Sequence, residues 1–145
     1  GIGAVISSRA TLAGAEGGCQ AECGAAAAMA AAALAELRGG SPAQSAHACA
    51  IALKNQLGLV CDPVAGLVEV PCIKRNAAGV MIALAAAEMA LAGVESKIPA
   101  DECVSAMYEV GCSMPASLRE TALGGLAATP TGRRLKQEIF GPSDS

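Results

Sequence analysis

The chain has 145 residues, of which 53% are hydrophobic, and its formal net charge at pH 7 is −3. This length suffices for one domain with a sizeable core, and the few Lys and Arg residues lie apart, which argues against a nucleic-acid partner. The longest apolar runs, residues 24–35 and 77–92, are shorter than the roughly 18–20 residues of a membrane span, so no membrane segment is expected.

The near absence of aromatic residues predicts the fold class. Aromatic residues make up 1% of the chain, so the core must consist of Ala, Leu, Val, Ile and Met. Alanine is the best helix former, and small side chains let helices approach closely. We therefore expect an all-α fold, a compact helical bundle. Because neither a repeat nor a linker divides the chain, we expect a single domain over residues 1–145.

The cysteine content bears on the cellular compartment. Seven cysteines occur, an odd number, and the N-terminus shows no signal peptide. A disulfide framework is therefore not expected, and the thiols are expected to stay reduced in the cytoplasm. Reduced thiols serve as small buried hydrophobes or as metal ligands, and we expect both kinds here. The chain opens with Gly1 rather than Met, as expected for a processed product or a piece of a longer protein.

Helix starts and stops divide the chain into elements. Gly39-Gly40 ends the first helix, and Ser41-Pro42 starts the second as N-cap and first helical residue. The expected elements are, in order, an irregular segment at Gly1–Gly18, helices at Cys19–Arg38 and Ala43–Leu57, a loop at Leu59–Pro71, and helices at Cys72–Leu91 and Ala100–Cys112. The helix at Cys72–Leu91 is apolar nearly all round, so we expect it to be buried in the middle of the bundle.

The C-terminal region carries weaker signals. Its prolines and glycines are spaced closely, so any helix there must be short. The expected elements are a short helix after Pro115 that Gly124-Gly125 stops, a turn at Thr129–Gly132, a half-exposed helix at Arg133–Phe140 and a fraying tail at Gly141–Ser145.

The stretch Gly58–Asn76 interrupts the alanine-rich helical pattern. Prolines and glycines break it, and Cys61 and Cys72 stand eleven positions apart within it. Because irregular loops that carry thiols and charges commonly hold functional sites, we expect the fold to present this loop. Two interpretations of the thiols stay open. In the first, the two thiols share a metal. In the second, they are small buried residues flanking a turn, which the spacing favours because strong zinc and ferredoxin patterns keep thiols two to four residues apart.

Cys19 follows Glu16-Gly17-Gly18 at the start of the first expected helix. A helix N-terminus favours the thiolate form, which suits a ligand or a nucleophile. A cysteine that only closes a tight Gly-Gly turn is the alternative. Cys23 lies one helical turn later and could face the same region.

The remaining thiols and the single histidine are expected to be structural. Cys49 lies in an alanine-rich helix. Cys103 and Cys112 are nine positions apart, and we place both on nearly the same helix face, in the core. His47 is a minor candidate for proton transfer, but no feature pairs it with a particular thiol.

Asp62, Lys74, Arg75 and Asn76 are the polar residues closest to the loop cysteines. The last three form a cluster at the start of a helix, where hydrogen-bond donors would suit an anionic small molecule. A solvated first helical turn is the alternative.

Three segments together resemble a known family, the catalytic α portion of the iron–sulfur-dependent bacterial L-serine dehydratases. They are Ala13–Gly24 (AGAEGGCQAECG), Asn55–Asn76 (NQLGLVCDPVAGLVEVPCIKRN) and Arg119–Gly132 (RETALGGLAATPTG), with Ile98–Glu102 as a further signal. These segments spread over nearly the whole chain, and the middle one is long and specific.

The resemblance implies a [4Fe–4S] cluster bound by three cysteines, which fall on Cys19, Cys61 and Cys72. Three thiolates for four irons leave one iron open for Lewis-acid chemistry on the hydroxyl of L-serine. The implied activity is that of an L-serine ammonia-lyase, which releases pyruvate and ammonia in amino acid degradation and gluconeogenesis. The thiols left for the core are Cys23, Cys49, Cys103 and Cys112.

Roles beyond the ligand set rest on position in the sequence. Asp62, Lys74, Arg75 and Asn76 are the candidate catalytic residues, for tuning the cluster and contacting substrate. The catalytic portion of the resembled family is longer than this chain, which corresponds to its C-terminal half. We therefore expect the N-terminal half and a β domain or subunit as partners, in a homo-oligomer. The base is expected in the missing half, and the fragment alone is expected to be inactive.

Three alternatives stay open beside this hypothesis. A related cluster enzyme would remove sulfide from L-cysteine, and pyruvate release from serine and cysteine distinguishes the two. A non-catalytic helical module would dock on a partner through exposed apolar surface, and a clean monomer in size exclusion argues against it. A structural zinc site would show in metal analysis.

Overall fold

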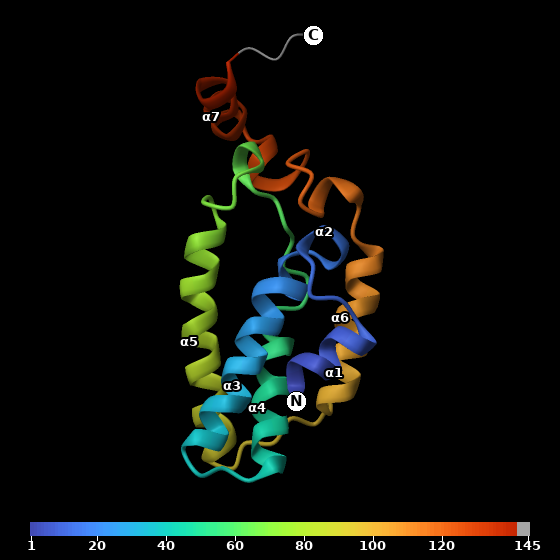
Figure 1. Cartoon of the computed structure of the whole chain (residues 1–145), viewed down its shortest axis with the longest axis vertical. Coiled ribbons are helices and arrows are strands. Elements are labelled where there is room, and N and C mark those ends of the chain that lie inside the picture. Colours follow the sequence, from blue (N-terminus) through green and yellow to red (C-terminus); the bar gives the residue numbers. More distant parts are fainter. Residues whose placement is uncertain (142–145) are drawn as a thin grey trace.

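The computed structural model describes residues 1–141 of the chain. Within these residues the elements are helices and helical turns, with no β-strand and a single isolated bridge between Cys61 and Arg119 (Figure 1). The predicted all-α fold is confirmed. No helix in the described part is both long and apolar enough to cross a membrane. Residues 142–145 of the predicted fraying tail lie outside the described residues.

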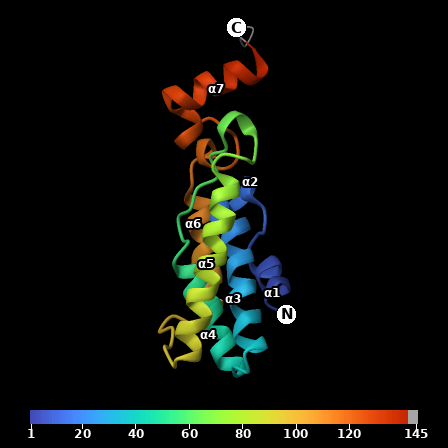
Figure 2. The same ribbon diagram turned by 90° about the vertical axis from the view of Figure 1, so that its left-hand side faces the viewer.

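Four helices form the bundle, and Figures 1 and 2 show them running along its long axis. They are α3 (Ala25–Leu37), α4 (Pro42–Lys54), α5 (Cys72–Leu91) and α6 (Ala100–Ser113). α3 packs against α4 and α5, and α4 packs against α6. Alanines such as Ala28, Ala31 and Ala35 in α3 are fully buried. Methyl side chains let the helices approach closely, so the core forms almost without aromatic residues.

The N-terminal segment is helical, contrary to the irregular segment expected at Gly1–Gly18. It forms α1 (Ile2–Arg9) and the short α2 (Gly14–Gly17). Ile6 is fully buried in the main core, and Ile2 packs against the same core. These two isoleucines are one helical turn apart and anchor one face of α1. The prediction was wrong because the surrounding Gly and Ser residues masked this short apolar pattern.

The first long helix predicted, at Cys19–Arg38, forms in two parts. A π-helical turn at Gln20–Gly24 leads directly into α3. Gly39 follows α3 with a φ of 83°, a left-handed conformation that glycine adopts readily, so the predicted glycine stop is confirmed. The predicted helix exists, and its first turn is wider than expected.

α4 begins as the sequence predicts. The Ser41 hydroxyl accepts the Gln44 N–H at 3.2 Å, and the Gln44 side chain accepts the Ser41 N–H at 2.9 Å. This capping box satisfies two N–H groups that have no partner inside the helix. α4 ends at Lys54, before the predicted Leu57, because the chain already turns there toward Gly58.

α5 has the predicted bounds but not the predicted burial. Its inner face packs on α3 and α4 through buried alanines. The part of its surface that these neighbours leave uncovered exposes large apolar side chains, namely Ile73, Val80, Met81 and Leu84. The helix in the middle of the bundle is α3 instead. The prediction was wrong because an apolar, alanine-rich composition does not show which face of a helix its neighbours cover.

Beyond α6 the chain crosses one end of the bundle in short pieces. These are 3-10 turns at Ala116–Leu118 and Gly125–Ala128 and helix α7 at Pro130–Phe140. The short helix expected after Pro115 is thus only a turn. α7 begins earlier than the predicted Arg133, because the Thr129 hydroxyl accepts the Gly132 N–H at 3.1 Å and Pro130 takes the first helical position. α7 packs against the 3-10 turn at Val64–Gly66, so the C-terminal region covers the cysteine loop (Figure 1).

Candidate metal centre

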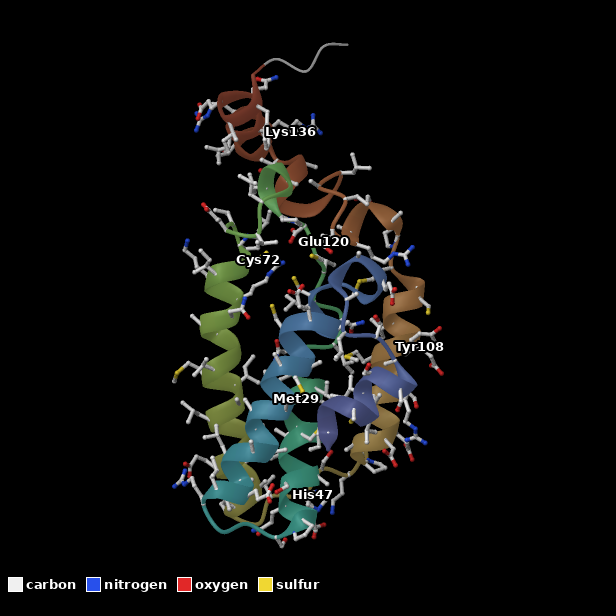
Figure 3. All side chains as sticks on the ribbon, in the orientation of Figure 1. Met29, His47, Cys72, Tyr108, Glu120 and Lys136 are labelled. Carbon is white, nitrogen blue, oxygen red and sulfur yellow. The ribbon has the colours of Figure 1, made fainter. Side chains whose placement is uncertain are left out.

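Four cysteines gather at the end of the bundle where α5 begins. Cys19, Cys23 and Cys61 pack together, and each is at most 4% exposed. Cys72 is the first residue of α5, is 8% exposed, and lies near enough to Cys23 and Cys61 to contribute to the rise in the pKa of each. Figure 3 shows Cys72 at the same end of the bundle as Glu120. The fold thus brings together the three cysteines singled out from the sequence and adds Cys23.

The residues on either side of Cys19 fix its position. Gly18 has a φ of 75°, and a Cβ atom there would lie 2.9 Å from the Leu59 carbonyl oxygen, so this close approach requires glycine. Gln20 is buried, donates its backbone N–H to Leu59 at 2.9 Å, and donates its side-chain amide to the Met107 carbonyl at 2.7 Å. Cys19 is therefore held between the cysteine loop and α6.

Cys61 is held by the chain segment that follows α6. Its N–H donates to the Leu118 carbonyl at 2.9 Å, and its own carbonyl accepts the Glu120 N–H at 2.7 Å. These two bonds join residues that are almost sixty positions apart in the sequence. They explain why a segment near the C-terminus belongs to the same site as the loop.

Asp62 and Arg75 form an ion pair beside the thiols. The Asp62 carboxylate is buried and accepts two hydrogen bonds, one from Nη1 of Arg75 at 2.8 Å and one from the Leu126 N–H at 2.7 Å. Nη1 of Arg75 also donates to the Val60 carbonyl at 2.8 Å and lies 3.7 Å from Sγ of Cys19. Burial alone would lower the pKa of Arg75, but its hydrogen bonds to Asp62 and Cys19 outweigh burial and raise it. Arg75 is thus a permanent positive charge at the thiol group.

Lys74 and Asn76 do not join this network. Both are exposed in the first turns of α5, and the Asn76 side chain donates to the Cys72 carbonyl at 3.0 Å. Of the four polar candidates from the sequence, the fold brings Asp62 and Arg75 to the thiols.

The thiols at the site hold their protons tightly, so metal binding would displace protons from them. Burial, followed by the neighbouring Cys19, raises the pKa of Cys61 far above the ordinary thiol value and raises that of Cys23 to about 11. Burial and Cys19 also raise the pKa of Cys72. Without a metal these thiols carry their protons at neutral pH, and a bound metal releases those protons. A buried, sulfur-rich donor set with one fixed cation fits an iron–sulfur cluster.

The thiols do not converge on one point. Among residues 1–141, no three His, Cys, Asp or Glu side chains are arranged to hold a single metal ion. In a [4Fe–4S] cluster each iron takes its own thiolate, so the ligands surround a larger group. Cys19, Cys61 and Cys72 stand on separate segments at the same end of the bundle, which is compatible with a group of that size.

Two carboxylates at the site escaped the sequence analysis as functional residues. A Cβ atom on Gly14 would lie 3.0 Å from Oε2 of Glu22, 3.2 Å from Sγ of Cys61 and 3.6 Å from Oε2 of Glu120. Glu120 has a φ of 64°, a strained conformation for a non-glycine residue that often marks a functional site. Glu22 stands three positions after Cys19, and Glu120 lies within the Arg119–Gly132 segment. These positions were the signals available in the sequence, but neither indicates that the two carboxylates lie close together.

The remaining candidates lie elsewhere. Cys49 and Cys103 are in the main core, as expected. Cys112 is exposed, contrary to the prediction, because nine residues correspond to two and a half helical turns and place it opposite Cys103. His47 accepts the Ser96 N–H at 3.2 Å and lies at the other end of the bundle (Figure 3).

Comparison with known proteins identifies the relatives of the chain. Residues 1–127 match the family model described as serine dehydratase alpha chain. The chain is 64% identical over 140 residues to the probable L-serine dehydratase, alpha chain, of Bacillus subtilis, covering 97% of this chain and 47% of that protein. It is 59% identical over 144 residues to the L-serine dehydratase, alpha chain, of Peptoniphilus asaccharolyticus, covering 99% and 49%.

A more distant relative shows the same relation. The chain is 52% identical over 127 residues to L-serine dehydratase 2 of Escherichia coli, covering 87% of this chain and 28% of that protein. The chain therefore spans about half the length, or less, of these three curated relatives.

Proposed function

The chain belongs to the serine dehydratase alpha chain family, and we propose that it forms part of an L-serine ammonia-lyase that binds a [4Fe–4S] cluster through Cys19, Cys61 and Cys72. The observation that carries this proposal is the burial of these three thiols in one place, although they come from separate segments. The names of the relatives support the lyase class. The cluster and its ligands rest on the donor set of the site.

The side chains of the site suit an elimination reaction. When bound, the cluster would supply a Lewis acid that polarises the C–O bond of the serine hydroxyl. The chain contributes the thiolates and their charge balance. Arg75 places a positive charge 3.7 Å from Sγ of Cys19, and Asp62 holds the guanidinium in that position. Such partners fix the orientation of metal ligands and tune the metal.

The proposed substrate, L-serine, is a zwitterion, and we propose partners for each of its two charges. Glu22 and Glu120 lie beside Cys61, and within residues 1–141 neither side chain has a hydrogen-bond or ion-pair partner. These free carboxylates suit the ammonium group of an amino acid. Lys74 and Asn76 are exposed at the start of α5 and remain our candidates for the substrate carboxylate.

The rest of the catalytic portion is the partner proposed for the exposed face of α5. That face carries Ile73, Val80, Met81 and Leu84. A row of apolar side chains of this kind marks an interface in a soluble protein. Because the chain spans about half of its relatives, we assign the face to the missing half, which also supplies the base. A β domain or subunit and a homo-oligomer remain predictions.

The location proposed for the enzyme is the cytoplasm. All seven cysteines are free thiols. Thiols stay reduced in the cytoplasm, where a cluster that depends on them also persists.

The test of the proposed function is pyruvate release by the full-length protein after anaerobic reconstitution with iron and sulfide. We expect activity with L-serine, and loss of activity together with the visible sulfur-to-iron absorption in Cys61→Ser and Cys72→Ser. Cys49→Ser, which alters an equally buried thiol of the main core, is the matched control and should retain both. Equal activity in Cys61→Ser and Cys49→Ser would contradict the proposal. Faster turnover of L-cysteine than of L-serine would assign the chain to a cysteine desulfidase instead.

A further inference from the structure

A cavity of about 390 Å³ lies between α2 and α6, and the proposed function gives it no role. Figure 1 shows α2 beside the end of α6 from which the C-terminal region continues. Gly14, the first residue of α2, lies beside Sγ of Cys61. The rest of α2 lines the cavity, namely Ala15, Glu16 and Gly17. α2 therefore borders both the thiol site and this cavity.

Arg119 is the cation that lines the cavity. Within residues 1–141, its Nε atom is buried and has no hydrogen-bond partner. Nη1 donates to the backbone carbonyl of Glu16 at 3.4 Å, which is long for a hydrogen bond, and no carboxylate in that part of the chain forms an ion pair with the guanidinium. Buried donors normally have a partner. The planar fork of an arginine side chain suits a carboxylate group, which would supply that partner.

The backbone that carries Arg119 is held in place on both sides. The Leu118 carbonyl accepts the Cys61 N–H at 2.9 Å, and the Glu120 N–H donates to the Cys61 carbonyl at 2.7 Å. The hydroxyl of Thr121 donates to the Ala116 carbonyl at 2.8 Å. A fixed backbone reduces the entropy that a ligand of Arg119 would cost on binding.

Glu16 brings the opposite charge to the same cavity. Its carboxylate accepts the Thr11 hydroxyl and forms no ion pair with a cation of residues 1–141, Arg119 included. A simple anion on Arg119 would therefore meet a negative charge in the same cavity, and a simple cation on Glu16 would meet a positive one. A ligand that carries both charges satisfies the two residues at once.

We propose that this cavity binds a small free α-amino acid, with the α-carboxylate on Arg119 and the ammonium group on Glu16. Ala15, Ala116 and Tyr108 also line the cavity, and Figure 3 shows Tyr108 on α6. The alanine methyl groups leave room for a small side chain on the ligand. The site differs from the substrate site proposed at the thiols in both of its charged residues, and it needs no cluster.

The test is isothermal titration calorimetry of the full-length protein with L-alanine, which has no hydroxyl group to eliminate. It compares the wild type with Arg119→Lys and Glu16→Gln. Each substitution should weaken binding about tenfold or more, because each removes a hydrogen bond between charged groups. Glu109→Gln is the matched control and should bind as the wild type does, since Glu109 is an exposed carboxylate of α6 outside the cavity lining.

Two truncated ligands and one further variant complete the test. Propionate lacks the ammonium group of L-alanine, and L-alaninamide lacks its carboxylate. Each should bind the wild type about tenfold more weakly than L-alanine does, or weaker still. Ala15→Leu fills the cavity without altering either charge and should also remove binding. Far-ultraviolet circular dichroism checks that each variant is folded, and Ala15→Leu keeps the test decisive if Arg119→Lys is not.

Glu22→Gln separates this cavity from the proposed substrate site. It should retain the binding of L-alanine that Ala15→Leu removes. Binding that is lost in Glu22→Gln and kept in Glu16→Gln would place the ligand at the thiols and overturn the inference. Propionate that binds as tightly as L-alanine, or a wild type that binds no L-alanine, would overturn it as well. A wild type that binds L-alanine here but takes up no cluster would contradict the proposed function alone.

Discussion

Asp62 is the residue at which the cysteine loop, α5 and the C-terminal region meet. Its carboxylate accepts hydrogen bonds from Arg75 and from the Leu126 N–H. The Asp62 side chain is 3% exposed and that of Arg75 is 18% exposed. Two partly desolvated charges stabilise the fold only as long as each keeps the other as its partner.

Asp62→Asn should therefore destabilise the chain. It leaves the Arg75 guanidinium without a counter-charge, a loss of about 2–3 kcal/mol after allowance for the partial exposure of Arg75. Urea unfolding of the apoprotein measures the change. Glu95→Gln is the control, because its ion pair with Lys97 is exposed, and it should change the stability by less than about 0.5 kcal/mol. Equal effects of the two substitutions would show that the buried pair has no special role.

Gly125 allows the C-terminal region to approach Asp62. It has a φ of 58°, and a Cβ atom there would overlap the Asp62 carboxylate. Gly125→Ala should cost more than the roughly 1–2 kcal/mol that a left-handed alanine costs alone. Gly39→Ala is the matched control, because Gly39 has a φ of 83° and no atom within 4 Å of its Cβ position. If the two variants unfold at the same urea concentration, the contact with Asp62 does not constrain this segment.

The candidate site was predictable only in part at this scale. The resemblance named Cys19, Cys61 and Cys72, and the loop itself drew attention to Asp62. Glu120 was not predictable, because its place depends on a backbone bridge to Cys61 that joins distant segments. A sequence shows which residues can do chemistry, whereas long-range hydrogen bonds decide which of them meet.

At the scale of the element, α3 shows how an alanine-rich helix builds a core. Its buried positions include Ala28, Ala31 and Ala35, all fully buried between α4 and α5. The close packing leaves no room for larger side chains. The helix spacing therefore depends on these methyl groups.

Ala31→Leu should separate α3 from its neighbours. Overpacking of a closely packed core costs about 1–3 kcal/mol. Ala30→Leu is the control on the adjacent, exposed position of the same helix and should stay within about 0.5 kcal/mol of the parent. Thermal unfolding of the two variants gives the comparison, and a stability of Ala31→Leu equal to that of Ala30→Leu would indicate a loosely packed core.

Helix bounds were more predictable than helix environments. Stops and caps act locally, so Gly39, Ser41 and the start of α5 agree with the sequence. The environment of α5 depends on what packs against it, and an apolar sequence fits a central helix and an interface helix equally well. The π-helical turn at Gln20–Gly24 also gave no local signal, because its residues suit an ordinary helix.

At the scale of the whole molecule, the exposed face of α5 is the surface that we propose for contact with the rest of the alpha chain. Met81 and Val80 lie on that face and are 64% and 59% exposed. Met81→Glu should leave the stability of the chain within about 0.5 kcal/mol of the parent, since the side chain packs on nothing that it would lose. It should weaken co-purification with the remaining half of the alpha chain when the two are expressed separately.

Leu37→Glu is the control for this experiment. Leu37 is 82% exposed at the end of a different helix, α3. This variant should co-purify with the remaining half as the parent chain does. Equal recovery with Met81→Glu and Leu37→Glu would show that the α5 face is not where the missing half docks.

The central claim is that Cys19, Cys61 and Cys72 together bind a [4Fe–4S] cluster. Iron and acid-labile sulfide content of the anaerobically reconstituted full-length protein tests it most directly, in the wild type, in each single serine variant of these residues and in Cys103→Ser as a buried core control. We predict about four irons and four sulfides per chain in the wild type and the control, and a large loss in each of the three variants. Less than one iron per chain in the wild type, or an undiminished content in the three variants, would contradict the claim.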